Sequence, residues 1–300
     1  MTGNVEVLSL KNHLDCEMLM HRDSHFGGRF AEMIAYYQRE GRGIQLEFPI
    51  ERLARLARLQ EKLGIDLSQL LLNPLQVTRV RTAQDAYQSL RELAAKRELR
   101  GTAKHTLALL ILADREEPTD QLKAVVGLGG HVVEELIELL GARRYHDPLY
   151  PGFGLAPELA AKCLGSISDA RAIPALFAQL GNVGFFTEDV VLEALRNIGQ
   201  PSRDYLLEKL QREPIGEENQ QAAHALIHFR SDFEVAATSF RLLIDERVRD
   251  HPSLANFLVM ICEGLAGTSL AASFQRLQHD ESVPQLVRHD VKEVIQTWQR

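Results

Sequence analysis

The side chains best suited to metal chemistry gather near the N-terminus of the chain. Residues 13–25 contain imidazole, thiol and carboxylate groups, the usual ligands of zinc and iron. They are His13, Asp15, Cys16, Glu17, His21, Asp23 and His25. Their spacing matches neither HExxH nor a paired CxxC motif, and Gly27-Gly28 predicts that a helix ends there. We therefore expect polar surface or turn-capping residues with no metal and no cofactor. Metal binding by His21, Asp23 and His25 is the alternative.

Three arginines follow on an amphipathic segment, residues 49–72. Pro49 is suited to a helix start and Gly64 to a helix end. Leu53, Leu56, Leu59 and Leu63 share one face of this helix, and Arg52, Arg55 and Arg58 share another. Such a row of guanidinium groups can dock an acidic partner or an anionic surface, and a solvated polar face is the competing interpretation. Asn73-Pro74 then breaks the chain, and residues 83–100 are predicted to form a further helix.

Two aromatic breaks interrupt the helical pattern further along the chain. Residues 142–156 lack periodicity but combine two prolines and two glycines with aromatic side chains, which favours an ordered loop over disorder. Gly184-Phe185-Phe186 is the second break. Aromatic side chains are typical anchors of protein interfaces. The predicted partner-binding residues are therefore Tyr145, His146, Tyr150, Phe153, Phe185, Phe186, Arg52, Arg55 and Arg58. The alternative is that the rings cover the ends of a helix stack.

No known catalytic motif is present. The sequence lacks a nucleophile elbow, a P-loop and the kinase motif set. The glycines of residues 127–130 resemble part of a dinucleotide-binding loop, but a valine stands in place of the third glycine and the segment follows a predicted helix. No catalytic residue is predicted, and the sequence favours a non-catalytic protein.

The elements that position these residues are predicted to be paired helices. Residues 157–180, PELAAKCLGSISDARAIPALFAQL, contain two apolar stripes with helical spacing, one ending at Ile167 and one beginning at Ile173. Ser168 and Asp169 interrupt the pattern and can cap the second helix. The segment therefore predicts two short helices joined by a tight turn.

The same helix–turn–helix pattern recurs along the chain. It returns at 190–210 and 220–243 and precedes the first unit at 121–140. A pair of short helices cannot bury both of its apolar stripes alone, so successive pairs must stack. A period of roughly 31 to 34 residues is typical of helical solenoids. We therefore predict an all-α fold, an α-solenoid of antiparallel helix pairs with a helical N-terminal segment.

Residues 157–180 resemble a HEAT repeat of the short bacterial type, also called the phycobilisome-lyase HEAT-like repeat. The matching residues are Ala160, Leu164, Gly165, Ile167, Asp169, Arg171, Ala172, Ile173, Pro174 and Leu176. The resemblance covers residues 104–245 and is most specific at 157–210. It implies a superhelix of stacked pairs in which Asp169 and Arg171 have a structural role between neighbouring repeats.

The resemblance also brings two enzyme families into consideration. Deoxyhypusine hydroxylases bind iron through His-Glu pairs in successive repeats, but none of the eleven histidines of this chain is followed by glutamate. Phycobilin lyases attach bilins to phycobiliproteins, and their chemistry has no motif that transfers to this sequence. The predicted function is a non-catalytic scaffold or adaptor that binds a protein partner along the solenoid surface. A bilin-lyase-like or other small-ligand-handling enzyme is the alternative.

Charge and composition restrict the partners and the location. Residues 1–104 carry 16 basic and 13 acidic side chains, whereas residues 105–300 carry 18 and 28. An acidic array argues against nucleic acid as a partner. The first residues lack the pattern of a signal peptide, and no apolar run has the length of a membrane span. The spacing of Cys16, Cys163 and Cys262 predicts no disulfide framework. We predict a cytoplasmic protein that binds neither nucleic acid nor membranes, with self-association left open.

The chain is predicted to contain three regions. Residues 1–101 form a helical N-terminal cap or adaptor, residues 102–245 form the HEAT-like array, and residues 246–300 form C-terminal helical cap repeats. Terminal repeats often depart from the pattern because one of their faces meets water.

Overall fold

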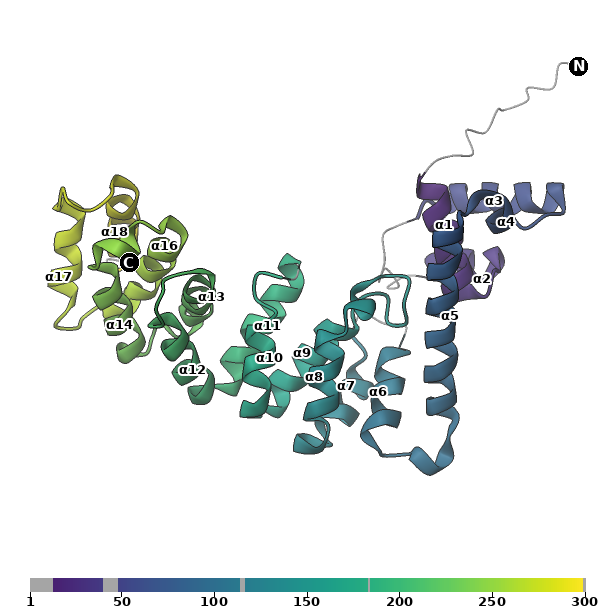
Figure 1. Cartoon of the computed structure of the whole chain (residues 1–300), viewed down its shortest axis with the longest axis horizontal. Helices are drawn as coiled ribbons and strands as arrows, with labels where there is room; N and C mark the ends of the chain where they lie inside the picture. The colour runs from purple at the N-terminus through teal and green to yellow at the C-terminus, as the bar shows by residue number, and fades with distance from the viewer. Residues whose placement is uncertain (1–12, 40–47, 114–116, 183, 299–300) are drawn as a thin grey trace, which may run out of the picture. The chain divides into compact units, whose positions relative to one another are not determined.

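The computed structural model of the chain describes residues 13–39, 48–113, 117–182 and 184–298 (Figure 1). Every regular element in these ranges is a helix, which confirms the all-α prediction. No helix among the described residues is both long enough and apolar enough to cross a membrane. The chain divides into two compact units, Met1–Ala160 and Ala161–Arg300, which are described separately. The predicted division into three regions stays a prediction.

In the first unit, helix α1 packs against three other helices. The helices of this unit are α1 (His13–Phe26), α2 (Phe30–Tyr37), α3 (Ile50–Leu63), α4 (Leu67–Leu71), α5 (Pro74–Ala95), α6 (Ala103–Ile111), α7 (Thr119–Val126) and α8 (Val133–Gly141), and α9 (Ala156–Ile167) crosses into the second unit. Helices α2, α4 and α5 all pack against α1, while α3 packs against α2. Because α1 meets neighbours on several sides, it buries polar as well as apolar side chains.

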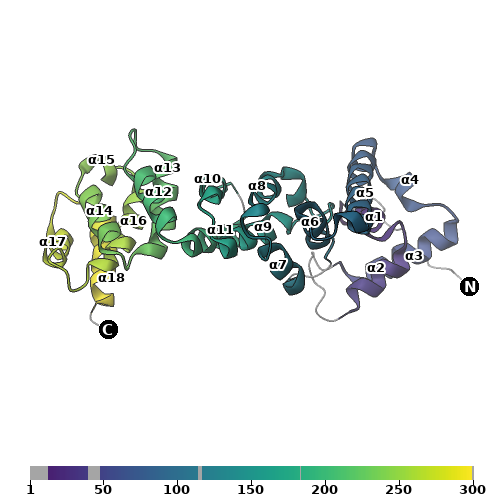
Figure 2. The ribbon, with the colours of Figure 1, turned by 90° about the horizontal axis from the view of Figure 1, so that it is seen from below.

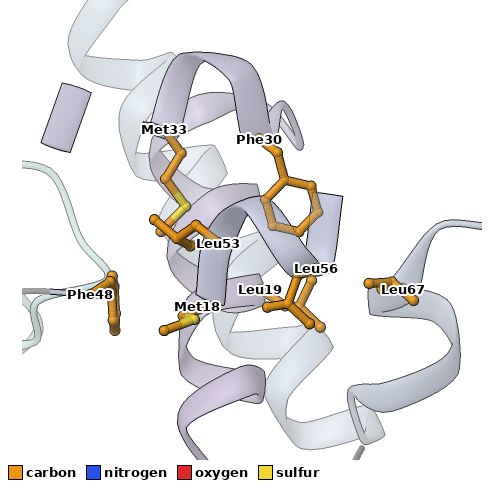
Figure 3. Close-up of a cluster of buried hydrophobic side chains, with 8 residues drawn as sticks. All are labelled: Met18, Leu19, Phe30, Met33, Phe48, Leu53, Leu56 and Leu67. Carbon is orange, nitrogen blue, oxygen red and sulfur yellow. The ribbon is translucent and has the colours of Figure 1, made fainter. Parts of the chain in front are cut away.

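A hydrophobic core lies between helices α1, α2, α3 and α4 (Figure 3). Its buried members are Met18, Leu19, Phe30, Met33, Phe48, Leu53, Leu56 and Leu67. The break predicted at Gly27-Gly28 separates α1 from α2, and both glycines have positive φ angles, +57° and +79°. Gly64 ends α3 in the left-handed conformation, as the sequence predicts. These local signals confirm the predicted boundaries of α1 and α3.

Helix α5 begins well before the predicted helix over residues 83–100. The Asn73 side chain accepts a hydrogen bond from the Gln76 amide, and the Gln76 side chain accepts one from the Asn73 amide. Pro74 occupies the first helical turn. Asn73 and Pro74 therefore begin a helix, whereas the sequence predicts a break there. The predicted boundaries, residues 83–100, are wrong, since α5 covers Pro74–Ala95.

The second unit contains short helices, most of which contact the next helix along the chain. They are α10 (Ile173–Phe177), α11 (Phe185–Ile198), α12 (Gln200–Leu210), α13 (Glu217–Leu226), α14 (Phe233–Leu243), α15 (Glu246–Arg249), α16 (Pro252–Ile261), α17 (Ala271–Arg276) and α18 (Gln285–Thr297). Helix α13 packs against α11 and α16, and α16 packs against α18 (Figure 2). Helix α14 packs against α12 and α16. Apolar stripes of neighbouring helices therefore cover each other.

Several polar contacts in the second unit join residues that are a similar number of positions apart in the sequence. The Ser168 hydroxyl donates to the Asn197 carbonyl 29 residues away. Arg203 donates to Asp232, also 29 residues away, and Asn256 donates to Asp290 at a separation of 34 residues. Asp169 and Arg171 bond to each other across the turn before α10.

Candidate functional site

The metal-type side chains of residues 13–25 bond to other protein groups. Asp15 is fully buried and accepts two hydrogen bonds from the Arg52 guanidinium, at 2.7 and 2.5 Å. Among the described residues, no group of three or more His, Cys, Asp or Glu side chains is arranged to hold a metal. The polar side chains in the last turns of α1 belong to two further clusters, one around Arg22 and one around His25.

The Arg22 cluster lies at the junction of α1, α3 and α4. The Arg22 side chain has no exposed surface. Its Nε donates to Asp23 at 2.6 Å, and its terminal nitrogens donate to Gln60 at 2.6 Å and Asp66 at 2.7 Å. The Ser68 hydroxyl accepts from Arg22 at 2.9 Å and donates to Asp23. A buried guanidinium requires such a set of acceptors, because its desolvation is otherwise uncompensated.

The two carboxylates of this cluster titrate in opposite directions from their ordinary values. Burial raises the pKa of Asp23, and its bonds with Ser68 and Arg22 offset only part of this effect. Burial acts to raise the pKa of Asp66 as well, but the hydrogen bonds from Arg22 and from the Ser68 amide outweigh it and lower that pKa. Asp66 is therefore a carboxylate at neutral pH.

A hollow of about 510 Å³ opens beside the Arg22 cluster. The end of α1, the α4 segment and the first half of α5 form its walls. The lining residues are Asp23, Gly27, Gly28, Asp66, Ser68, Gln69, Leu72, Val77, Val80, Arg81 and Gln84. The volume lies in the range of roughly 300–1,000 Å³ that is common for binding pockets. Carboxylate, guanidinium, amide and aliphatic groups all reach this one hollow.

Exposed aliphatic side chains are concentrated in the stretch of sequence that contributes residues to the hollow. Five of the eleven large apolar side chains that are exposed in the described part of the chain fall between residues 63 and 77. This 63–77 apolar set consists of Leu63, Ile65, Leu70, Leu75 and Val77. Leu70 is 56% exposed and Leu75 is 72% exposed. Helix α4 is only five residues long and buries Leu67 and Ser68, so it cannot also bury Leu70. Such concentrations of exposed apolar surface commonly mark interaction sites.

The His25 cluster holds the 142–156 loop. One ring nitrogen of His25, Nε2, lies 2.9 Å from the Pro148 carbonyl, and the other, Nδ1, lies 2.5 Å from the Tyr87 hydroxyl. Since a carbonyl only accepts, Nε2 carries the proton and the Tyr87 hydroxyl donates to Nδ1. The Phe153 ring stacks on His25 with 4.2 Å between centroids. The loop is also tied to α5 by the Tyr150 hydroxyl, which bonds to Thr82.

Two histidines of α1, His21 and His25, are neutral at physiological pH. Burial lowers the pKa of His25 to about 3, with His21 adding to the effect and the Pro148 carbonyl opposing it. Burial likewise lowers the pKa of His21 to about 4. The Nδ1 atom of His21 is buried without a hydrogen-bond partner. The surroundings of His21 and His25 therefore stabilise the neutral imidazole relative to the protonated imidazolium.

The predicted partner-binding residues have several different environments. In the 142–156 loop, Tyr145 and Phe153 are buried, Tyr150 is half-buried and His146 is exposed. On α3, Arg52 bonds to the buried Asp15, Arg55 is half-buried and Arg58 is exposed. Phe185 and Phe186 begin α11, but their side chains lie outside the part of the chain that the structure describes. The 142–156 loop and the Arg row both belong to the first unit, whereas Phe185 and Phe186 belong to the second.

The sequence patterns do not predict the Arg22 cluster, the hollow or the 63–77 apolar set. Two signals point to them. Arg22 follows Met18, Leu19 and Met20 on a helix that must bury them, which indicates a buried arginine that needs partners. Residues 65–72, IDLSQLLL, lie between the helix end at Gly64 and the start at Pro74 and contain more aliphatic side chains than so short an element can bury.

Comparisons with known proteins give no relative for this chain. No family model matches it, and no curated protein and no solved structure matches it. The resemblance of residues 157–210 to HEAT-like repeats therefore stays a hypothesis.

Proposed function

We propose that the chain is a non-catalytic scaffold that binds a protein partner through the first unit. The 63–77 apolar set is the observation that carries this proposal. Leu70 and Leu75 are exposed in the same stretch of chain that contributes Gln69, Leu72 and Val77 to a hollow lined by both charged and aliphatic groups. Exposed aliphatic side chains beside a mixed hollow have the composition of a protein-binding site, in which an apolar centre is surrounded by polar groups.

The second unit is, in this proposal, an α-solenoid of HEAT-like repeats. Polar contacts at separations of 29 to 34 residues support it, because stacked repeats place equivalent positions of neighbouring units side by side. Gly165 gives further support. A Cβ atom there would lie 2.6 Å from the Ala194 Cα, so two helices about one period apart approach at a position where only glycine fits.

Site-specific photo-cross-linking in the native cell tests this function. A photoreactive phenylalanine analogue replaces Leu70 or Leu75 in one set of chains, and Leu286 in a matched control. Leu286 is 59% exposed and lies in the second unit, so it reports random collisions of a similarly exposed leucine. We expect a discrete protein adduct from positions 70 and 75. Adducts of equal yield from all three positions, or none, would contradict the proposal.

A further inference from the structure

The Arg22 cluster holds an excess of negative charge. Arg22 contributes one positive charge, whereas Asp23 and Asp66 contribute two carboxylates. Arg22 is fully buried and bonds to both carboxylates and to two neutral side chains, so its donors are committed within the cluster. The remaining charge is at Asp66, because Asp66 is ionised and its side chain is 43% exposed.

Asp66 is also arranged to accept a further hydrogen bond. Both bonds that it receives, from the Arg22 guanidinium and from the Ser68 amide, fall on Oδ1. The Oδ2 atom accepts from neither group. Asp66 lines the hollow. A carboxylate oxygen in a partly enclosed site favours a cationic donor, since charge-assisted hydrogen bonds are roughly twice as strong as neutral ones.

The apolar groups around Asp66 restrict the kind of cation. Leu72, Val77 and Val80 line the hollow, and Leu70 and Leu75 are exposed in the same stretch of chain. A small inorganic cation would leave these side chains in water. A lysine or arginine side chain places its aliphatic stem against apolar walls and its charged end on a carboxylate.

The partner is best matched by a helix. Because every regular element of the described residues is helical, this part of the chain offers no strand edge for β-augmentation. An amphipathic helix can instead place apolar anchors at i, i+3, i+4 and i+7 along a groove. An anionic partner, such as a nucleic acid or an acidic membrane, would bring like charge to Asp66.

We infer that the hollow between α1, α4 and α5 binds a lysine or arginine side chain from an amphipathic helix of a protein partner. The apolar stripe of that helix covers Leu70, Leu75 and Val77, and the basic side chain bonds to Asp66. Arg81, on the α5 wall of the same hollow, favours an acidic residue elsewhere on the partner helix. This inference rests on the proposed function and specifies the chemistry of the partner.

Selection of displayed peptides on the full chain tests this inference. The probe is a library of 18-residue helical peptides that are randomised along one face. We expect the enriched peptides to carry an apolar stripe with one lysine or arginine in it. Replacement of that basic residue by glutamate should weaken binding by about tenfold or more. Enriched peptides without a basic residue, or no enrichment, would overturn the inference.

Two matched variants locate the interaction. Asp66→Asn keeps an Oδ1 acceptor for Arg22 and the Ser68 amide but removes the charge, so it should abolish the preference for lysine while the chain stays folded. Arg81→Gln removes a charge of opposite sign from the same hollow and should keep the preference. If both variants select the same peptides as the wild type, Asp66 is not the acceptor and the inference is wrong.

The 63–77 apolar set gives the last control. Leu75→Ser should weaken every enriched peptide at least tenfold. Sedimentation velocity of the chain alone shows whether a second copy of the chain, and not another protein, binds the 63–77 apolar set. A dimer that Leu75→Ser dissociates would overturn the inference. Cross-links from positions 70 and 75 to a partner, together with peptides that show no basic preference, would leave the proposed function standing and remove only the inference.

Discussion

The two units of the chain use polar and small residues in opposite ways. In the first unit, Arg22 loses all exposed surface and depends on Asp66 and Ser68, which lie 44 and 46 residues away in the sequence. In the second unit, Arg203 and Asp232 bond near the surface, and close packing depends on glycine. Buried charged contacts therefore join α1 to α3 and α4, whereas close backbone approach at Gly165 and Gly264 joins neighbouring segments of the second unit.

This difference matches the proposed roles. A buried charge network is costly to assemble but strongly restricts the arrangement of its partners, which suits a surface that must present Asp66 and the 63–77 apolar set in one geometry. Packing of helices through small residues repeats along a chain, which suits an array.

The largest effect is expected for Arg22→Met. This change leaves the Asp23 and Asp66 carboxylates without their buried counter-charge, so the free energy of unfolding should fall by about 3–5 kcal/mol. Chemical denaturation measures the loss. Arg58→Met is the matched control, because Arg58 is exposed on α3. Adding Asp23→Asn and Asp66→Asn to Arg22→Met should recover part of the stability. Equal losses for the two single Arg variants would refute the importance of the buried cluster.

Gly264→Ala should be the most damaging small change in the second unit. A Cβ atom at Gly264 would lie 1.7 Å from the Arg230 carbonyl oxygen, a backbone atom that cannot rotate away. We expect a loss of about 3 kcal/mol in the free energy of unfolding. Gly141→Ala is the control, since nothing lies within 4 Å of its added Cβ. A stability for Gly264→Ala equal to that of this control would show that the second unit does not depend on close backbone packing.

Acidification should destabilise the first unit through His25. An unfolded histidine takes up a proton near pH 6.5, whereas folded His25 does so only near pH 3. Between these values the unfolded chain binds more protons, so stability falls as pH falls. At pH 5 the loss is about 2 kcal/mol for this histidine. His25→Phe should flatten the stability profile between pH 7 and 5 by that amount, and His13→Ala, at an exposed position, should not. Identical slopes for the two variants would contradict the burial of neutral His25.

Asn73→Ala should have a smaller, purely local effect. It removes the side-chain acceptor that caps α5 at an exposed position, so the expected loss is about 1 kcal/mol. Thermal unfolding followed by circular dichroism gives the value. The effect should be the same in a background of Gly264→Ala, because the two sites are far apart in sequence and lie in different units. Strong non-additivity would mean that the two units do not respond independently.

The smallest effect is expected for Arg203→Gln. Arg203 and Asp232 form a partly exposed ion pair, and such pairs contribute little because water already solvates both charges. The denaturation midpoint should stay close to that of the wild type, in contrast to Arg22→Met. A loss as large as that of Arg22→Met would reverse the comparison between the units.

The sequence predicts the features that depend on neighbouring residues. The all-α fold, the break at Gly27-Gly28 and the end of α3 at Gly64 follow from periodicity and local backbone chemistry, and the structure confirms them. The start of α5 differs from the prediction because Asn73-Pro74 has the pattern of a chain break, whereas Asn73 and Gln76 form a capping box that begins a helix.

The candidate site depends on contacts that one sequence does not reveal. The spacing of Asp23 and His25 indicates metal-type ligands, but their long-range partners Ser68 and Tyr87 are set by how α1 packs against α4 and α5. The exposure of an apolar side chain also depends on residues that are distant in the sequence. Leu63 belongs to the predicted apolar stripe of α3, yet it is exposed because the core ends before the last turn of that helix.

Hydrogen exchange of the purified complex shows whether the partner binds at the first unit. The chain and the protein that cross-links to position 75 are exchanged together and apart, and protection is mapped along the chain. The proposal predicts added protection in residues 63–84, which include α4 and the wall of the hollow that α5 forms. Protection that is confined to residues 161–300, with none in residues 63–84, would contradict partner binding at the first unit.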